Sequence, residues 1–513
     1  MTNLQTLSAY LQECRWCNFK EEIKNGSVYD IQLEKVPYDN GRKLFVIGQA
    51  SLLDGKTVKF SMPMARKYAM PQNQNNLVID GAIYTDALQE PDFWQTLNKF
   101  IDENDGVVTF PNGWKLKRLG IAKTEVIEAN KNETSKPLGV EQSNTTLNIG
   151  NGNLAFKLER ILDFSTELNP EFEMNEKLMR EGCGVMPETY GGLLWETPDG
   201  KQSSCGIIQE FVKNKGDMWN HSLGYLHGKL KVHYLRQLDL TAKNCPEFVE
   251  LVKNLQQKTA EMGDCLSRPD DNKNFTPEVV TPSFIRTYEK NLTVLLYQTK
   301  QTITNNLHNL PEPTKTQARE LLANWDETTK KFVQNNIAKI ISSEQQGYTC
   351  RVHGDFHLGQ VMVTPNDDLR FIDFAGEPAL PIEQRKQKHI YVRDIAGMYR
   401  SIKGYLGAVA VEDYAASAPT EEIANERKAW AQKAIKPLID TASKEFLGER
   451  TMAEPWLALE VLRKNLYEVN YEVASRPSMA YVPIMGLSEL FNTPDNGGAS
   501  MGIDNDFDNA EGM

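Results

Sequence analysis

Alternation of apolar and polar residues predicts strands in the first two hundred residues. Within residues 154–158 every second side chain is apolar, which places Lys157 on the opposite face. The dipeptide Asn151-Gly152 precedes this run and suits a tight turn, because both positions tolerate positive φ. Together with the apolar run at residues 147–149 it predicts a β-hairpin. Further β-like runs occupy residues 43–47 and 57–60.

Helical periodicity dominates the chain from about Asn214 onward. The expected helices are residues 224–240, 247–266, 281–304, 314–342 and 458–475, preceded by helices at 7–17 and 170–179. Residues 351–374 interrupt the helical block with a β-like pattern. The polar stretch at 131–139, which contains Pro137, is predicted to be a linker.

Composition narrows the class of protein. The chain has 513 residues, of which 40 % are hydrophobic and 25 % charged, which predicts several folded units. Its net charge of −12 argues against binding to nucleic acid, whose phosphates attract cationic proteins. We find no membrane-spanning run and no secretory signal, so we expect a cytoplasmic protein. Seven scattered cysteines predict no disulfide framework, and the Cys14/Cys17 pair is interpreted as chance.

Candidate chemistry concentrates in residues 351–374. Turn-forming residues 364–368 separate two short apolar runs, so the segment is predicted to be a hairpin. Asp355 and Gln360 precede the first run and Asp373 follows the second, so these oxygen-bearing side chains should meet at one end. Phosphoryl transfer needs such a set, with one carboxylate for the attacking hydroxyl and oxygen ligands for Mg²⁺. The alternative is an ordinary hairpin with Asp-rich turns.

A second group of candidates lies on the helix expected at 458–475. One face carries two aromatic and three charged side chains, which are Lys464, Glu468, Tyr471 and Glu472, with Tyr467 at its border. Such a stripe suits a sugar site, because aromatic rings lie against a pyranose and charged groups bind hydroxyls. A solvated face with Glu–Lys pairs is the alternative interpretation.

Several motifs together resemble a known family, the maltokinases, which belong to the aminoglycoside-phosphotransferase-like branch of the protein-kinase fold. The motifs are His353-Gly-Asp-Phe-His-Leu-Gly-Gln360, Asp373-Phe-Ala-Gly-Glu-Pro378, Arg393-Asp-Ile-Ala-Gly-Met398, Tyr467-Glu-Val-Asn-Tyr-Glu472 and Glu141-Gln-Ser-Asn-Thr145. The chain also departs from the family pattern at several positions, which include Cys17 in place of an aromatic residue, and two of the departures bear on the site. Ala375 replaces a glutamate, and Met479 replaces a tryptophan whose flat ring would help to bind a disaccharide.

The resemblance implies roles in catalysis and nucleotide binding. Asp355 would be the catalytic base, while Gln360 and Asp373 would hold Mg²⁺. Lys157 would reach the ATP phosphates and Glu173 would pair with it, although Glu171 and Glu176 are rivals and an exposed strand lysine is the alternative. The phosphate cap would be Ser143, Asn144 and Thr145, and the adenine hinge would include Gln209, Glu210 and Val212.

The resemblance also implies a substrate site. Its residues would be His357, Arg393, Lys464, Tyr467, Glu468, Tyr471 and Glu472. For His357 and Asp394, a supporting role that holds the catalytic loop by hydrogen bonds is the favoured interpretation.

The implied fold is α+β, bilobal and protein-kinase-like. We expect an N-terminal cap subdomain at 1–100, a β-rich N-lobe at 101–213, a mostly helical C-lobe at 214–490 and a disordered acidic tail at 491–513. The implied activity is ATP- and Mg²⁺-dependent phosphorylation of maltose to maltose 1-phosphate, which feeds α-glucan (glycogen) synthesis, in functional association with a trehalose synthase. The alternatives are a kinase of another sugar, such as glucosamine or glucose, and a nucleotide-binding pseudokinase or scaffold.

Overall fold

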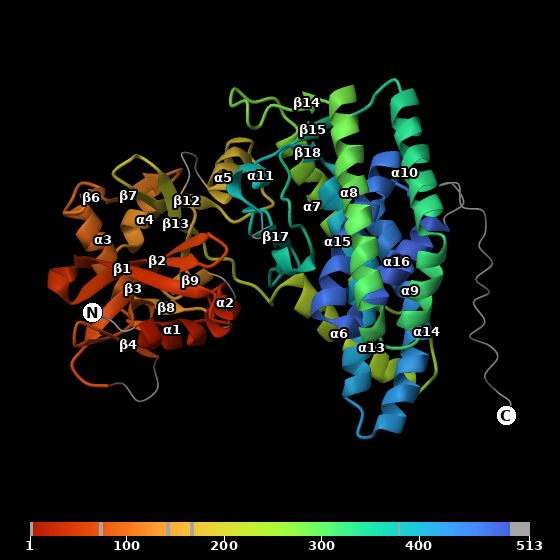
Figure 1. The fold of residues 1–513 in the computed structure, drawn as a ribbon, viewed down its shortest axis with the longest axis horizontal. Coiled ribbons are helices and arrows are strands. Elements are labelled where there is room, and N and C mark those ends of the chain that lie inside the picture. Colours follow the sequence, from red (N-terminus) through yellow and green to blue (C-terminus); the bar gives the residue numbers. More distant parts are fainter. Residues whose placement is uncertain (1–3, 71–74, 140–143, 165–168, 378–379, 493–513) are drawn as a thin grey trace. The chain divides into compact units, whose positions relative to one another are not determined.

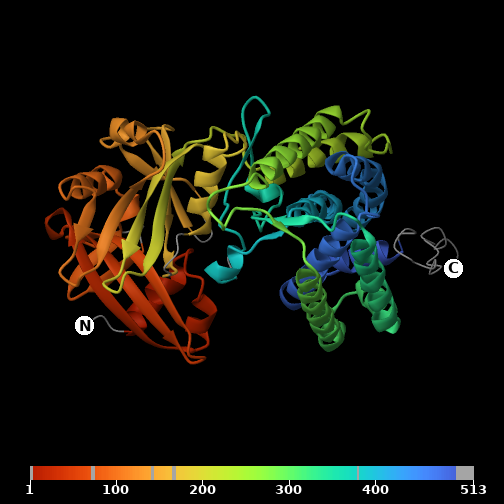
Figure 2. The same ribbon diagram turned by 90° about the horizontal axis from the view of Figure 1, so that it is seen from above.

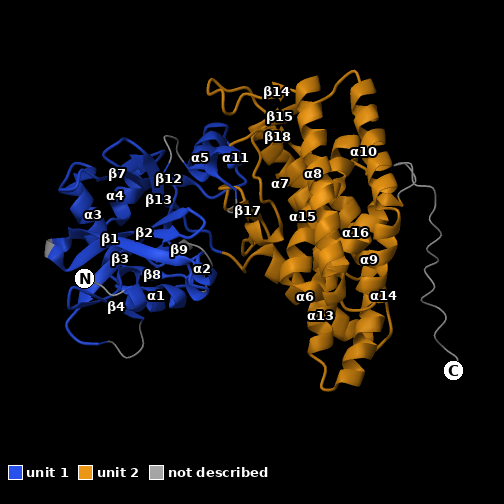
Figure 3. Cartoon of the chain, in the orientation of Figure 1, with its two compact units in different colours: residues 1–213, 378–385 blue, residues 214–377, 386–513 orange. Residues whose placement is uncertain are grey.

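The chain folds into two compact units, which are coloured separately in Figure 3. Unit 1 comprises residues 1–213 and 378–385, and unit 2 comprises residues 214–377 and 386–513. The structure is a computed structural model that describes residues 4–70, 75–139, 144–164, 169–377 and 380–492. The predicted tail therefore lies almost entirely outside the described residues.

Unit 1 contains two antiparallel sheets (Figures 1 and 2). The first has the order β1 (Val28–Tyr38), β2 (Lys43–Leu52), β3 (Thr57–Lys67), β5 (Ala82–Asp86) and β4 (Asn76–Ile79), with β11 (Ile161–Leu162) paired to β3. The second has the order β6 (Val107–Thr109), β7 (Lys115–Gly120), β12 (Thr189–Glu196), β13 (Gln202–Glu210), β10 (Leu154–Glu159), β9 (Asn144–Ile149) and β8 (Ser135–Pro137). The helices are α1 (Leu4–Glu13), α2 (Lys20–Lys24), α3 (Phe93–Asp102), α4 (Thr124–Asn130), α5 (Pro170–Arg180) and α11 (Ile382–Arg385).

The predicted hairpin at 147–158 is confirmed. Strands β9 and β10 pair with Leu154 opposite Ile149, and Asn151 in the turn has a φ of 61°. The apolar side chains of β10 are buried, as the alternation predicted. The linker predicted at 131–139 is corrected, because β8 pairs with β9 inside it. Pro137 is tolerated there because β8 is an edge strand of the sheet.

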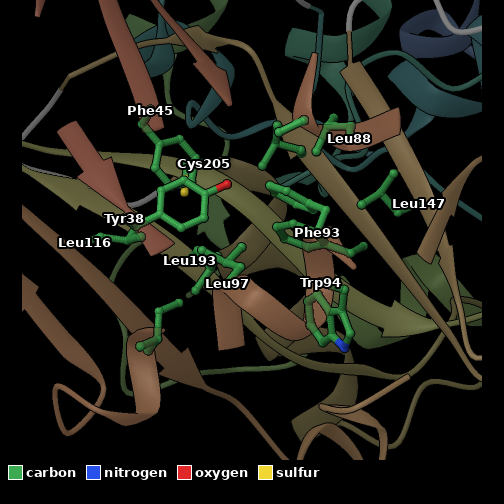
Figure 4. Close-up of a cluster of buried hydrophobic side chains, with 14 of the residues drawn as sticks. Tyr38, Phe45, Leu88, Phe93, Trp94, Leu97, Leu116, Leu147, Leu193 and Cys205 are labelled. Carbon is green, nitrogen blue, oxygen red and sulfur yellow. The ribbon is translucent and has the colours of Figure 1, made fainter. Parts of the chain in front are cut away.

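One buried cluster contains side chains from both sheets of unit 1 (Figure 4). It brings Tyr38 and Phe45 of the first sheet together with Leu193 and Cys205 of the second, and with Leu97 of α3. Apolar sheet faces are stabilised by burial against other apolar surfaces, at about 25 cal/mol per Å². The boundary between the cap subdomain and the N-lobe was expected at position 100. Residues from before and after this position share one core and belong to the same compact unit.

Unit 2 is mostly helical, and helix α15 (Pro455–Ser475) packs against four neighbours. These neighbours are α8 (Pro282–Asn306), α10 (Trp325–Ser342), α12 (Val392–Arg400) and α16 (Tyr481–Phe491). The remaining long helices are α6 (Met218–Tyr234), α7 (Pro246–Leu266), α9 (Thr314–Ala323), α13 (Gly407–Ala416) and α14 (Glu421–Leu447). A single helix was predicted at 314–342, but Asn324 has a φ of −120° and divides it into α9 and α10.

Two small sheets complete unit 2. The first consists of β14 (Glu278–Val279), β15 (Tyr348–Cys350) and β18 (His389–Ile390). The second is the hairpin of β16 (Val361–Val363) and β17 (Leu369–Phe371), which confirms the hairpin predicted within residues 351–374. The predicted α+β class is likewise confirmed. Within the described residues, none of the helices combines the length and apolar character that a membrane span needs.

Candidate active site

The β16–β17 hairpin carries the predicted carboxylate and amide groups at one end. Val361 pairs with Phe371, so the residues just outside the two strands are neighbours. The amide Nε2 of Gln360 lies 3.4 Å from Oδ2 of Asp373. Asp373 has a φ of 67°, a left-handed conformation that costs energy for a residue with a side chain. The chain thus holds Asp373 in a strained position beside Gln360, as is common at functional sites.

Asp394 holds the backbone of the loop that precedes the hairpin. Its two carboxylate oxygens accept hydrogen bonds from the backbone N–H groups of His353, at 2.7 Å, and Gly354, at 3.0 Å. Asp394 is 2 % exposed, and this burial raises its pKa, against the opposing effect of His353 and of the two hydrogen bonds. This geometry agrees with the supporting role expected for Asp394.

His353 adds a second anchor under the same loop. It is fully buried, its Nε2 lies 3.0 Å from the carbonyl oxygen of Ile372, and its ring packs on Phe374 at 4.7 Å between centroids. The loop that bears Asp355 is therefore fixed to both β17 and α12.

Asp355 presents a partly open carboxylate beside His357. Oδ2 of Asp355 lies 4.0 Å from Nε2 of His357. Nδ1 of His357 accepts a hydrogen bond from the N–H of Gly359, which leaves the proton of the neutral ring on Nε2. Burial lowers the pKa of His357, and the positive charge of Lys464 lowers it further, while Asp355 opposes both. A neutral His357 thus lies beside the Asp355 carboxylate, at a distance longer than a hydrogen bond.

Helix α15 brings Lys464 and Tyr467 to the same region. The Lys464 ammonium lies 5.1 Å from the centre of the Tyr467 ring. Burial raises the pKa of Tyr467, and the carboxylates of Glu377 and Asp355 raise it further. Asp355, Lys464, Tyr467 and Glu377 therefore lie close enough to influence one another, and they could bind a polyhydroxylated molecule with both charges and an aromatic face.

The other residues of the predicted stripe on α15 differ in burial, because the two glutamates are buried and Tyr471 is exposed. Glu468 is buried and accepts hydrogen bonds from the guanidinium of Arg400 at 2.9 Å, and Glu472 is buried beside the hydroxyl of Tyr405 at 3.2 Å. Tyr471 is 50 % exposed. Because α15 has helices on several sides, the two carboxylates point into the bundle, where they satisfy buried donors. The prediction that they share one open face with Lys464 and the tyrosines is therefore wrong.

Lys157 is paired in unit 1, but with a different residue from the one predicted. Its ammonium lies 3.0 Å from Oε2 of Glu171, which is buried in the first turn of α5. This pairing replaces the predicted one with Glu173. The reason is local, because Asn169 caps α5 by accepting from the N–H of Glu171 and donates to Glu159 on the Lys157 strand. The first turn of the helix is thereby held against β10.

The Glu159 carboxyl next to Lys157 is strongly perturbed. Burial and the negative charge of Glu171 raise its pKa to about 8, although Lys157, Arg385 and the hydrogen bond from Asn169 oppose the change. Glu159 is therefore protonated at neutral pH, and Glu171 is the carboxylate that balances Lys157.

The other residues predicted to bind the nucleotide, and Arg393, differ in their positions and in their hydrogen-bond partners. Thr145 is the second residue of β9 and pairs with Leu158, and its hydroxyl accepts from Nε of Arg160 at 3.3 Å. Gln209 and Glu210 end β13, and the amide of Gln209 donates to the Thr189 hydroxyl at 3.0 Å. Val212 follows β13, and Arg393 lies on α12. Ser143 and the side chain of Asn144 lie outside the described residues.

The donor set on the hairpin fits a magnesium ion bound together with nucleotide phosphates. Mg²⁺ takes one or two protein oxygen ligands and completes its shell with phosphate oxygens and water. The adjacent amide of Gln360 and carboxylate of Asp373 supply such ligands. Within the described ranges, no group of three or more His, Cys, Asp or Glu residues could hold a metal on its own.

Two residues of the site were not selected from the sequence. Glu377 lies in the Gly-Glu-Pro motif that follows Asp373. The motif was recognised in the sequence, but the position of Glu377 beside Tyr467 was not predicted. Asn169 directly precedes Pro170, a combination typical of a helix start, but its link to Glu159 depends on the tertiary structure.

Comparison with known protein sequences gives a partial match. No model of a known protein family matches the chain. A glucosamine kinase from Streptacidiphilus jiangxiensis is 30 % identical over 148 residues, which is 27 % of this chain. The match spans 31 % of the length of that curated relative.

Solved structures match almost the whole chain. Glucosamine kinase in crystal form B superposes with a TM-score of 0.56 at 16 % identity, over 91 % of this chain and 95 % of that one. Glucosamine kinase in complex with glucosamine, ADP and inorganic phosphate superposes with a TM-score of 0.54 at 16 % identity, over 96 % of this chain and 100 % of that one. The chain therefore shares the fold of these glucosamine kinase structures, while the resemblance to maltokinases remains a prediction.

Proposed function

We propose that this protein is an ATP- and Mg²⁺-dependent kinase that phosphorylates a sugar hydroxyl. The observation that carries the proposal is the Asp355 loop, which Asp394 and His353 hold beside the Gln360–Asp373 end of the hairpin. An ordinary hairpin with Asp-rich turns would not need a buried carboxylate to fix its backbone, nor a left-handed aspartate next to an amide. The shared fold with glucosamine kinase supports the same conclusion. The retained acidic and amide groups argue against a pseudokinase.

In the proposed reaction, Asp355 accepts the proton of the attacking sugar hydroxyl. The sugar oxygen forms a bond to the γ-phosphorus of ATP, the bond from this phosphorus to the bridging oxygen breaks, and ADP leaves. The neutral His357 lies 4.0 Å from the Asp355 carboxylate and would help to position it when the substrate is bound. Gln360 and Asp373 would hold Mg²⁺, which neutralises negative charge on the phosphates. Lys157, balanced by Glu171, would bind the phosphates from unit 1.

Maltose is the acceptor that the sequence motifs favour, and the product would be maltose 1-phosphate. The Lys464–Tyr467 pair supports a sugar acceptor, because an ammonium group binds hydroxyls and a ring covers a pyranose face. Met479 lies in a short helical turn after α15 and offers apolar surface without a flat ring, so we expect weakened maltose binding. Feeding of α-glucan synthesis and association with a trehalose synthase remain predictions from the resemblance.

Glucosamine is the second candidate acceptor, because a curated relative and several solved structures that match the chain are glucosamine kinases. The carboxylate of Glu377 beside Tyr467 would suit an ammonium group on the sugar, whereas Lys464 would oppose it. Glu377 favours glucosamine as the acceptor and Lys464 disfavours it. Comparing the activity with glucosamine and with maltose therefore tests which of the two charges dominates.

The test is an ADP-release assay with Mg²⁺, ATP and a panel of maltose, glucosamine and glucose. We expect Asp355→Asn to abolish turnover and to leave ATP affinity, measured by calorimetry, within a few-fold of the wild type. Asp367→Asn is the matched control, because Asp367 lies in the turn of the same hairpin and is exposed beside Lys215. This control should retain full activity. Full activity of Asp355→Asn would refute the mechanism.

A further inference from the structure

Unit 2 contains a cavity of about 720 Å³ with an excess of positive charge. It lies among the β14–β15–β18 sheet and helices α8, α12 and α15, and Tyr467 forms part of its wall. Five cationic side chains and one carboxylate line it, which are Lys273, Lys386, Lys388, Arg393, Arg463 and Glu278. Its volume lies within the range of about 300–1,000 Å³ that is usual for small-molecule sites.

Arg393 is the cation of this cavity that lies beside a histidine ring. Its Nη1 lies 2.8 Å from Nδ1 of His389, and no ion pair between Arg393 and a carboxylate occurs among the described residues. Burial lowers the pKa of His389, and the positive charge of Arg393 lowers it further, so His389 is a neutral acceptor. Burial and the nearby charge of Arg463 also lower the pKa of Arg393 itself. The guanidinium therefore lies in a site that disfavours its charge.

The nearby carboxylates already bind other cations. Glu460 is buried and accepts from Nε of Arg463 at 2.7 Å. Glu278 accepts from Lys388 at 2.5 Å, and Lys388 also donates to the carbonyl oxygen of Lys273 at 2.6 Å. The charges of Glu460 and Asp394 favour the Arg393 cation, but neither carboxylate forms an ion pair with it among the described residues.

Tyr288 supplies a hydroxyl at the same cavity. Its oxygen is buried near the carboxylate of Glu460, and it makes no hydrogen bond of normal geometry within the described part of the chain. Burial raises the pKa of Tyr288 well above its usual value, and the charge of Glu460 raises it further. The cavity thus contains a neutral hydroxyl donor, a guanidinium without a carboxylate partner and further cations.

We propose that this cavity is a binding site for a small molecule with a carboxylate or phosphate group, which Arg393 and the hydroxyl of Tyr288 bind directly. Arg393 is partly exposed in the cavity wall, and an anion paired with its guanidinium would offset the cost of removing that charge from water. Guanidinium groups bind carboxylates and phosphates through paired hydrogen bonds, in a geometry that few other groups match. Tyr467 belongs to the lining of this cavity, whereas Asp355, Gln360 and Asp373 do not, so the proposed anion site does not depend on those three residues.

The first experiment is calorimetric titration with inorganic phosphate and, separately, malonate, at an ionic strength held constant with sodium chloride. Phosphate and malonate distinguish a phosphate-binding site from one that also takes carboxylates, and binding of either supports the proposal. Arg393→Gln should raise the Kd at least tenfold, and Tyr288→Phe should raise it several-fold because it removes one donor without changing the shape of the side chain. Arg286→Gln is the matched control, since Arg286 is exposed on α8 away from the cavity lining. Its Kd should not change.

A second set of variants separates this site from the proposed nucleotide site. Inorganic phosphate could also bind at Lys157, so the titration is repeated with Lys157→Met and Asp355→Asn. Both variants should retain the anion binding that Arg393→Gln loses. Loss of binding in Lys157→Met with retention in Arg393→Gln and Tyr288→Phe would overturn the proposal, as would the absence of binding to the wild type. If Arg393→Gln fails to fold, Tyr288→Phe decides the question. Because these readouts involve no turnover, they are independent of the proposed kinase activity.

Discussion

Gly397 lies where helix α12 passes beneath the loop that bears Asp355. A Cβ atom added at this position would lie 2.8 Å from the carbonyl oxygen of Phe356. Carbon–oxygen contacts in proteins are usually about 3.3–3.6 Å, so the substitution Gly397→Ala creates an overlap of roughly half an ångström. The atom in the way belongs to the backbone, and it cannot rotate aside as a side chain can. Either α12 or the loop must therefore move.

The expected cost follows from two opposing effects. Overpacking in a well-packed region destabilises a protein by about 1–3 kcal/mol. Replacement of a helical glycine by alanine recovers up to about 1 kcal/mol through helix propensity. We therefore expect Gly397→Ala to lower the free energy of unfolding by about 1–2 kcal/mol. Because Phe356 directly follows Asp355, we also expect kcat to fall by about tenfold or more, since misplacement of a reacting group by about 1 Å can cost 100-fold.

Urea denaturation and steady-state kinetics measure the two effects on the same preparations. Gly228→Ala is the matched control, because Gly228 is exposed on α6 and an added Cβ would meet no atom within 4 Å. This control should gain about 0.5–1 kcal/mol and keep its kcat. If Gly397→Ala behaves like the control in both measurements, the close packing of α12 against the loop does not matter and the reasoning is wrong.

Three further predictions test other parts of the site. Lys464→Ala should raise the KM for the sugar about tenfold or more and change kcat much less, because it removes a charged hydrogen-bond donor; an unchanged KM for every sugar would place the acceptor elsewhere. Glu468→Gln should lower the free energy of unfolding by about 3 kcal/mol in thermal or urea melts, since it breaks the buried pair with Arg400, and leave KM unchanged. The third concerns pH. Folding raises the pKa of Glu159 from 4.5 to about 8, so the unfolded chain releases this proton first and stability should fall as pH rises from 4.5 to 8. Glu159→Gln should remove the part of the fall in stability that the Glu159 proton causes. If the dependence of stability on pH is the same in this variant as in the wild type, the raised pKa is wrongly assigned to Glu159.

The sequence by itself determined the local structures around the site. The β9–β10 hairpin follows from strict alternation and from Asn151-Gly152, and both signals are local. The same is true of the β16–β17 hairpin, whose turn residues separate two short apolar strands. Gln360 and Asp373 could therefore be predicted as neighbours, because the register of a short hairpin depends on its turn. The motif around Asp355 then indicated a kinase of the type whose fold the structure shares.

Only the tertiary structure decided which side chains those local elements bring together. Helical spacing grouped Lys464 with Glu468 and Glu472, but spacing cannot show which sides of α15 other helices cover. Likewise, Glu171 and Glu173 are equivalent in the sequence, and the link between Asn169 and Glu159 selects Glu171 as the partner of Lys157. The set of cations around Arg393 comes from elements far apart in the chain. Periodicity describes one element at a time, whereas burial and charge compensation depend on the neighbours that folding places around it.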